Sequence, residues 1–147
     1  MSVYQQSPAP AHRYADTHME PQYQVNAWPD PAALRGLRRA AWGELEGESD
    51  WSGVLARSLC WVTASDGERL VGFVNVAWDG GVHAFVLDTT VHPGVQRRGV
   101  GRELLRRASL EARARGAHWL HVDYEPQLEA FYRACGFTPT SAGLLRL

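Results

Sequence analysis

The chain has 147 residues, 45% of them hydrophobic, and a formal net charge of −1 at pH 7. This length and composition predict one globular domain with a single core, and no apolar run reaches the ~20 residues of a membrane-spanning helix. A nucleic-acid partner is not expected, because nucleic-acid-binding domains are usually basic. All 15 basic residues are arginine, so the chain offers no lysine for Schiff-base or general-base chemistry.

Residues 1–20 show no hydrophobic periodicity, and we expect them to form a flexible tail ahead of a domain over residues 21–147. The tail lacks the apolar segment of a secretory signal peptide. The two cysteines, Cys60 and Cys135, lie too far apart for a metal-binding motif. We therefore expect reduced thiols, no metal site and a cytoplasmic protein.

The start of the domain predicts a short strand and two helices. The strand is expected over residues 22–27, and the first helix follows with Asp30 as its N-cap and Pro31 in its first turn. The apolar stripe of this helix consists of Leu34, Leu37, Ala41 and Leu45. A second helix is expected over residues 51–59.

An antiparallel meander is predicted next, from three apolar runs that are separated by glycine-containing turns. Asp66-Gly67 and Asp79-Gly80-Gly81 are typical of hairpin turns. The three strands are expected over residues 60–64, 70–78 and 83–91.

The last third of the chain predicts a long helix, a strand, a short helix and a final strand. The long helix is expected over residues 103–115, ending at Gly116, with a buried face of Leu104, Leu105, Ala108 and Ala112. Its outer face carries two charge pairs, Glu103–Arg107 and Glu111–Arg115. The remaining elements are expected over residues 117–122, 127–134 and 144–147. Because a strand–helix–strand connection forms a parallel crossover, we expect an α/β fold with a mixed sheet and helices on both faces.

The stretch over residues 91–102 (VHPGVQRRGVGR) has the composition of an anion-binding turn at the start of a helix. A helix N-terminus offers free backbone N–H groups and a positive dipole end, and Gly99 and Gly101 would let an anion approach the backbone. Further charge-assisted contacts would come from Arg97, Arg98 and Arg102. The alternative is an ordinary turn with surface arginines. The stretch is neither a P-loop, which needs a lysine, nor a complete G-x-G-x-x-G motif.

Two motifs and the order of the elements resemble the GCN5-related N-acetyltransferase (GNAT) superfamily over roughly residues 22–147. Residues 96–101 (QRRGVG) resemble its Q/R-x-x-G-x-G/A acyl-CoA signature, with the usual Val-x-Pro before it, and residues 128–137 (LEAFYRACGF) resemble its A-x-Y-x-x-x-G-F segment. The resemblance implies a sheet in which an antiparallel meander is followed by a pair of parallel strands that splay apart.

The resemblance also implies acetyl-CoA as co-substrate. The pyrophosphate of coenzyme A would lie on Gln96, Arg97, Arg98, Gly99, Val100, Gly101 and Arg102. Backbone groups of Thr89, Thr90 and Val91 would pair with the pantetheine arm, and the Val91 N–H would stabilise negative charge on the thioester oxygen.

Proton transfer has several candidate residues. The resemblance implies that Tyr132 is the general acid for the leaving thiolate; the alternative is a tyrosine that packs its ring and exposes its hydroxyl. His121 lies where relatives carry a catalytic glutamate, although the loop over residues 123–125 is one residue shorter here. An imidazole near neutral pH suits a general base, acting directly or through water, but His121 could equally be a surface histidine.

Asp88 is a second candidate base, because it interrupts an apolar strand. A carboxylate there must either face a cavity or find a partner, and the alternative role is to cap Thr89 or Thr90 or to fix a bulge in the strand. Asp123 and Glu125 at the mouth of the splayed strands would favour a cationic amine. The tryptophans of the first helical region form either core or an aromatic wall for the acceptor: Trp28, Trp42 and Trp51.

These observations predict an N-acyltransferase that moves an acetyl group from acetyl-CoA to the primary amine of a small molecule or peptide. The amine would attack directly, since a covalent route through Cys135 has no adjacent base in the sequence. The alternative is a non-catalytic acyl-CoA-binding or sensor module of the same fold. No membrane partner is expected. The resemblance also suggests a homodimer, since members of the family are often dimers.

Overall fold

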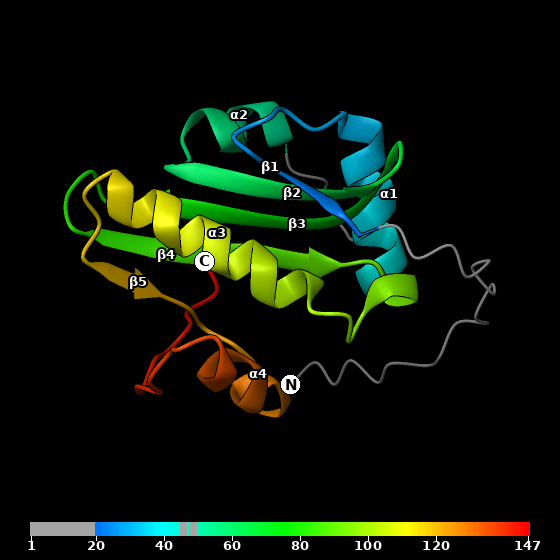
Figure 1. The fold of residues 1–147 in the computed structure, drawn as a ribbon. Coiled ribbons are helices and arrows are strands. Elements are labelled where there is room, and N and C mark those ends of the chain that lie inside the picture. Colours follow the sequence, from blue (N-terminus) through cyan, green and yellow to red (C-terminus); the bar gives the residue numbers. More distant parts are fainter. Residues whose placement is uncertain (1–19, 45–46, 48–49) are drawn as a thin grey trace.

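The fold is a mixed sheet with helices on both faces, as expected, and the sheet has five strands. The computed structural model describes residues 20–44, 47 and 50–147, so the expected tail up to residue 19 and the helical position Leu45 lie outside the described residues. The strands follow one another in the order β1-β2-β3-β4-β5. Helix α3 crosses one face, α1 and α2 lie on the opposite face, and α4 lies below β5 (Figure 1).

The elements agree closely with the hydrophobic pattern of the sequence. They are β1 Gln22–Val25, α1 Pro31–Trp42, α2 Trp51–Ala56, β2 Cys60–Asp66, β3 Arg69–Trp78, β4 His83–Val91, η1 Pro93–Val95, α3 Val100–Ala114, β5 Trp119–His121, η2 Pro126–Leu128 and α4 Glu129–Ala134. The Asp30 side chain accepts a hydrogen bond from the Ala33 N–H at 2.9 Å, which confirms the predicted N-cap. None of the described helices is both long and apolar enough to cross a membrane.

One predicted element is wrong. Residues 144–147 form no strand, and the side chains of Leu144 and Leu145 are 86% and 85% exposed. Two leucines in succession point to opposite faces of an extended chain, and this segment pairs with no strand of the described sheet that could cover either face.

Strands β1 to β4 are antiparallel to their neighbours, whereas β4 and β5 are parallel. The parallel pairing runs only from His83 opposite Trp119 to Phe85 opposite His121. Beyond Phe85, β4 continues to Val91 while β5 has ended. The expected separation of the two parallel strands is therefore present.

The core has two parts, one on each face of the sheet. Successive residues of β3 point to opposite faces, so Val74 packs under α3 and Phe73 packs under α1 and α2. The predicted apolar face of α3 is buried: Leu104, Leu105, Ala108 and Ala112. Trp51 belongs to the second part of the core, whereas Trp28 and Trp42 are exposed. The packing of both faces stabilises the positions of β4 and α3. The end of β4 and the start of α3 border the site described next.

Candidate active site

A β-bulge interrupts β4 at Asp88. The register passes from Thr90 opposite Phe73 to Leu87 opposite Asn75, so β4 holds one residue more than β3 in this interval. Asp88 has a φ of +58°, which few residues other than glycine, asparagine and aspartate adopt readily.

Helix α1 holds this bulge from one face of the sheet. The Asp88 carboxylate pairs with the Arg38 guanidinium at 3.1 Å, and Thr90 Oγ1 donates to the Asp88 carbonyl at 2.8 Å. The Arg38 guanidinium also lies 4.8 Å from the centre of the Trp51 ring. These contacts favour the bulge-fixing role of Asp88 over a role as base, because the carboxylate is already engaged by a cation.

The backbone at the end of β4 faces the gap left by β5. His92 donates its backbone N–H to the Val71 carbonyl at 2.8 Å, and Val91 lies opposite Gly72. In an antiparallel ladder this makes Gly72 and Val91 a non-hydrogen-bonded pair, so the Val91 N–H points away from β3. It points to the side on which β5 has ended.

Helix α3 begins without a side-chain cap. Gly99 is its N-cap residue, with a φ of +82° and no atom within 4 Å of the position where a Cβ would stand. The first backbone N–H groups of the helix therefore lack intrahelical partners. A Cβ on Gly101, in contrast, would lie 3.1 Å from the Phe131 ring. Gly101 thus permits the close packing of α3 on α4, and its expected contact with a ligand stays a prediction.

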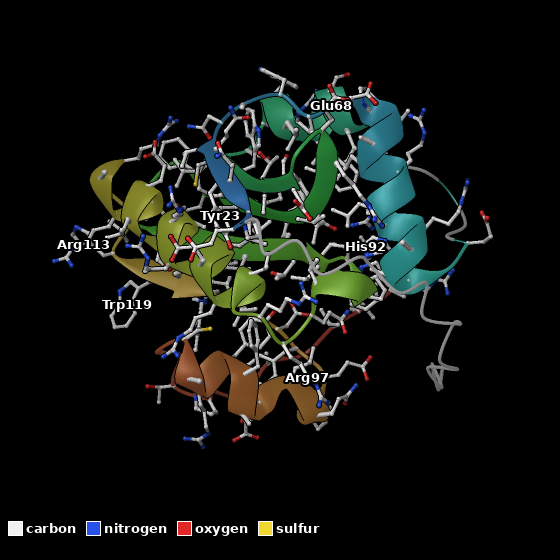
Figure 2. All side chains as sticks on the ribbon, turned by 45° about the vertical axis from the view of Figure 1, so that its right-hand side comes forward. Tyr23, Glu68, His92, Arg97, Arg113 and Trp119 are labelled. Carbon is white, nitrogen blue, oxygen red and sulfur yellow. The ribbon has the colours of Figure 1, made fainter. Side chains whose placement is uncertain are left out.

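The polar side chains around this turn divide into two groups. Gln96 Nε2 donates to the Val91 carbonyl at 3.2 Å, and the Arg102 guanidinium donates to the Ala134 carbonyl at 3.0 Å. Both thus brace the turn and α4. Arg97 and Arg98 are exposed, and Figure 2 shows Arg97 beside α4. Arg97 and Arg98 thus supply exposed positive charge at the start of α3.

Tyr132 of α4 lies beside Thr89, near the bulge in β4. The residue is 6% exposed, and its ring stacks on Tyr124 with ring centres 4.8 Å apart. Burial raises the pKa of the Tyr132 hydroxyl, although the nearby Thr89 hydroxyl opposes the rise, so the phenol stays protonated near neutral pH. Thr89 Oγ1 is buried, and the Tyr132 hydroxyl is its neighbour. Two hydroxyl groups thus converge at the bulge.

His121 lies at the point where the parallel strands separate. Its side chain is exposed and stacks on Phe85, and its Nε2 atom lies 2.8 Å from His83 Nδ1. This pairing with His83 was not predicted from the sequence. The signal that could have found it is the parallel register, which brings the start of β4 beside β5.

A cavity of about 1230 Å³ borders the gap. It lies between β4, β5 and the segment after α4, and its lining includes Phe85, Leu87, His121, Asp123, Tyr124 and Cys135. Asp123 thus stands at this opening, as expected, while Glu125 is not part of the lining. Burial raises the pKa of the Cys135 thiol, which disfavours the thiolate that a covalent route would need.

Known proteins match both the sequence and this arrangement. Residues 56–139 match the model of the acetyltransferase (GNAT) domain. Serotonin N-acetyltransferase 2, chloroplastic, from Oryza sativa subsp. japonica is 35% identical over 74 residues, which cover 50% of this chain and 37% of that protein. The chain spans less than half the length of the curated relatives it matches.

Solved structures share the fold. A probable acetyltransferase from meticillin-resistant Staphylococcus aureus superposes with a TM-score of 0.74 at 21% identity, covering 86% of this chain and 99% of that one. Aminoglycoside N-acetyltransferase AAC(6')-Iy in complex with CoA superposes with a TM-score of 0.69 at 18% identity, covering 89% and 97%. Since the family model spans more than half of the sequence, the chain belongs to the GNAT acetyltransferase domain family.

Proposed function

We propose that this chain is an N-acetyltransferase that moves an acetyl group from acetyl-CoA to a primary amine by direct attack. The observation that carries the proposal is the gap between β4 and β5. The Val91 N–H, the buried Thr89 hydroxyl and the Tyr132 phenol all meet this gap. A preorganised N–H donor beside a protonated phenol suits a reaction that develops negative charge first on oxygen and then on sulfur.

The residues present fit coenzyme A. The uncapped start of α3 with its open Gly99, together with Arg97 and Arg98, would hold the pyrophosphate. Val100 and Gly101 would contribute backbone N–H groups, while Gln96 and Arg102 would brace the turn through their contacts with Val91 and Ala134. Once bound, acetyl-CoA supplies the acetyl group in activated form as a thioester.

Backbone groups of β4 would orient the pantetheine arm, because β4 runs on past the end of β5 with unpaired polar groups. This assigns the segment from Thr89 to Val91 to the arm. The Val91 N–H would donate to the carbonyl oxygen of the acetyl group, and Tyr132 would give its proton to the leaving sulfur. The buried Thr89 hydroxyl beside the Tyr132 phenol supports this assignment, because it adds a second polar group at this end of β4.

His121 would accept the proton of the attacking amine, directly or through water. Asp88 would act on the backbone instead, through its ion pair with Arg38.

The acceptor side of the gap is apolar and aromatic. Phe85, Leu87 and Trp42 are 38%, 41% and 48% exposed, and Trp42 Nε1 donates to Thr90 Oγ1 at 3.4 Å. Asp123 is the carboxylate at the cavity opening. An amine with an aromatic or apolar body and one cationic nitrogen, on a small molecule or a peptide, suits these surroundings.

Thiol release from acetyl-CoA tests the proposal. The purified chain is incubated with serotonin, an aminoglycoside, a polyamine and a peptide with a free N-terminus, and free thiol is measured. We expect amine-dependent release, greatest for serotonin, and a loss on the order of a hundredfold in kcat for Tyr132→Phe. Tight binding of CoA without turnover of any amine would instead identify a non-catalytic acyl-CoA-binding module.

A further inference from the structure

Two histidines face one another where β4 and β5 separate. His83 Nδ1 lies 2.8 Å from His121 Nε2, and at that distance one of the two nitrogens carries the shared hydrogen. The parallel register brings them together, since His121 lies opposite Phe85 and His83 is two residues earlier on the same face of β4.

The surroundings hold this histidine pair in place. The His121 ring stacks on Phe85, with ring centres 4.8 Å apart and 20° between the planes. Asp79, in the turn between β3 and β4, accepts the backbone N–H groups of Gly81 at 2.7 Å and of His83 at 3.3 Å. This carboxylate fixes the turn from which β4 starts. The contact with His83 engages Nε2 of His121, so a substrate would have to use the other ring nitrogen, Nδ1.

We infer that His83 is a positioning residue that accepts the Nε2 hydrogen of His121 and so leaves His121 Nδ1 unprotonated. The inference rests on the proposed function, in which His121 takes the proton of the amine. Neutral His121 would then carry its hydrogen on Nε2, which is the only one of the two neutral forms that has a basic Nδ1.

The proton balance follows from this arrangement. As the new bond between nitrogen and the acetyl carbon forms, His121 Nδ1 accepts one proton from the amine nitrogen and the ring becomes a cation. His83 Nδ1 continues to accept the Nε2 hydrogen and stabilises the positive charge. The proton on Nδ1 then passes to water, and His121 returns to its starting form. An uncharged acceptor at position 83 is therefore sufficient.

Two substitutions of His83 separate positioning from packing. Asparagine can place a carbonyl oxygen close to the position of Nδ1, whereas leucine removes the acceptor. We expect His83→Leu to lower kcat about tenfold with little change in KM, and His83→Asn to retain most of the activity. His118→Leu, at an exposed histidine near the start of β5, is the matched control and should resemble the unchanged protein.

Nitrogen NMR of the imidazole rings tests the same inference without turnover. In the unchanged protein we expect His121 to be protonated at Nε2, and in His83→Leu to become a mixture of both neutral forms. His121 protonated at Nδ1 in the unchanged protein, or equal activity of His83→Leu and the unchanged protein, would overturn the inference. An inactive protein with the expected NMR signals would overturn the proposed function alone.

Discussion

Asp88 combines a left-handed backbone conformation with a carboxylate bound by an arginine. Asparagine adopts positive φ about as readily as aspartate, so Asp88→Asn keeps the bulge and removes only the charge that pairs with Arg38. If Asp88 positions the backbone, the loss in kcat should be a few-fold.

The control for this prediction is Asp88→Val, because a β-branched side chain is strained at positive φ. We expect it to disturb the bulge and to lower both stability and activity. A general base contributes about 10²- to 10⁴-fold, so a loss of that size in Asp88→Asn, measured by thiol release, would make Asp88 the base after all.

The Asp30 cap was predictable because it needs only its neighbours in sequence. The roles given to Tyr132 and the other site residues stay predictions, although the segment around Tyr132 forms a short continuous motif. The pairing of His83 with His121 and of Asp88 with Arg38 joins elements distant in sequence. These contacts depend on the register of strands and on where α1 crosses the sheet, which composition does not specify.

Among the elements, α3 and α4 depend on one another through a glycine. A Cβ at Gly101 would lie 3.1 Å from the ring of Phe131, the residue next to Tyr132. Gly101→Ala should therefore displace α4, destabilise the fold by about 1–2 kcal/mol and reduce activity.

Gly36 offers the matched control, since it lies in α1 with ordinary φ and no atom within 4 Å of the place that a Cβ would occupy. Alanine there should stabilise the helix by up to about 1 kcal/mol and leave activity unchanged. Thermal unfolding and thiol release compare the two variants. Equal stability of Gly101→Ala and Gly36→Ala would contradict the close packing of α3 on α4.

Elements with a strong pattern were predicted well and the chain end was not. Alternation of apolar residues and Asp-Gly turns placed β2, β3 and β4, and the periodicity of Leu104, Leu105 and Ala108 placed α3. Leu144 and Leu145 suggested a strand from hydrophobicity alone. A strand also needs a partner edge, and that requirement is not visible in four residues.

For the whole molecule, the buried Cys60 thiol links folding to alkaline pH. Burial raises the pKa of this thiol to about 11, above its ordinary value near 9, because the folded state disfavours the thiolate. Below pH 9 the thiol is protonated in both the folded and the unfolded state. As pH rises from 9 towards 11 mainly the unfolded state ionises, so the free energy of unfolding falls by about 2 kcal/mol.

Denaturant unfolding between pH 8 and 11 tests this prediction. Cys60→Ala should be less stable at pH 8, because it leaves a small cavity, but should lose less stability as pH rises. Cys135→Ala is the comparison: burial also raises the pKa of that thiol, but Cys135 is only partly buried, so its removal should change the pH dependence less. Parallel stability curves for Cys60→Ala and the unchanged protein would contradict a buried, protonated Cys60.

The side chains of Thr89 and Thr90, at the end of β4, point in different directions. Thr89 lies towards Tyr132, while Thr90 contacts Trp42 of α1. Under the proposed function, the strand therefore separates the side that would hold the thioester from the side that would hold the amine. Substrates that enter from opposite sides of a wall do not obstruct each other, so either can bind first. Steady-state kinetics should therefore follow a random-order sequential scheme.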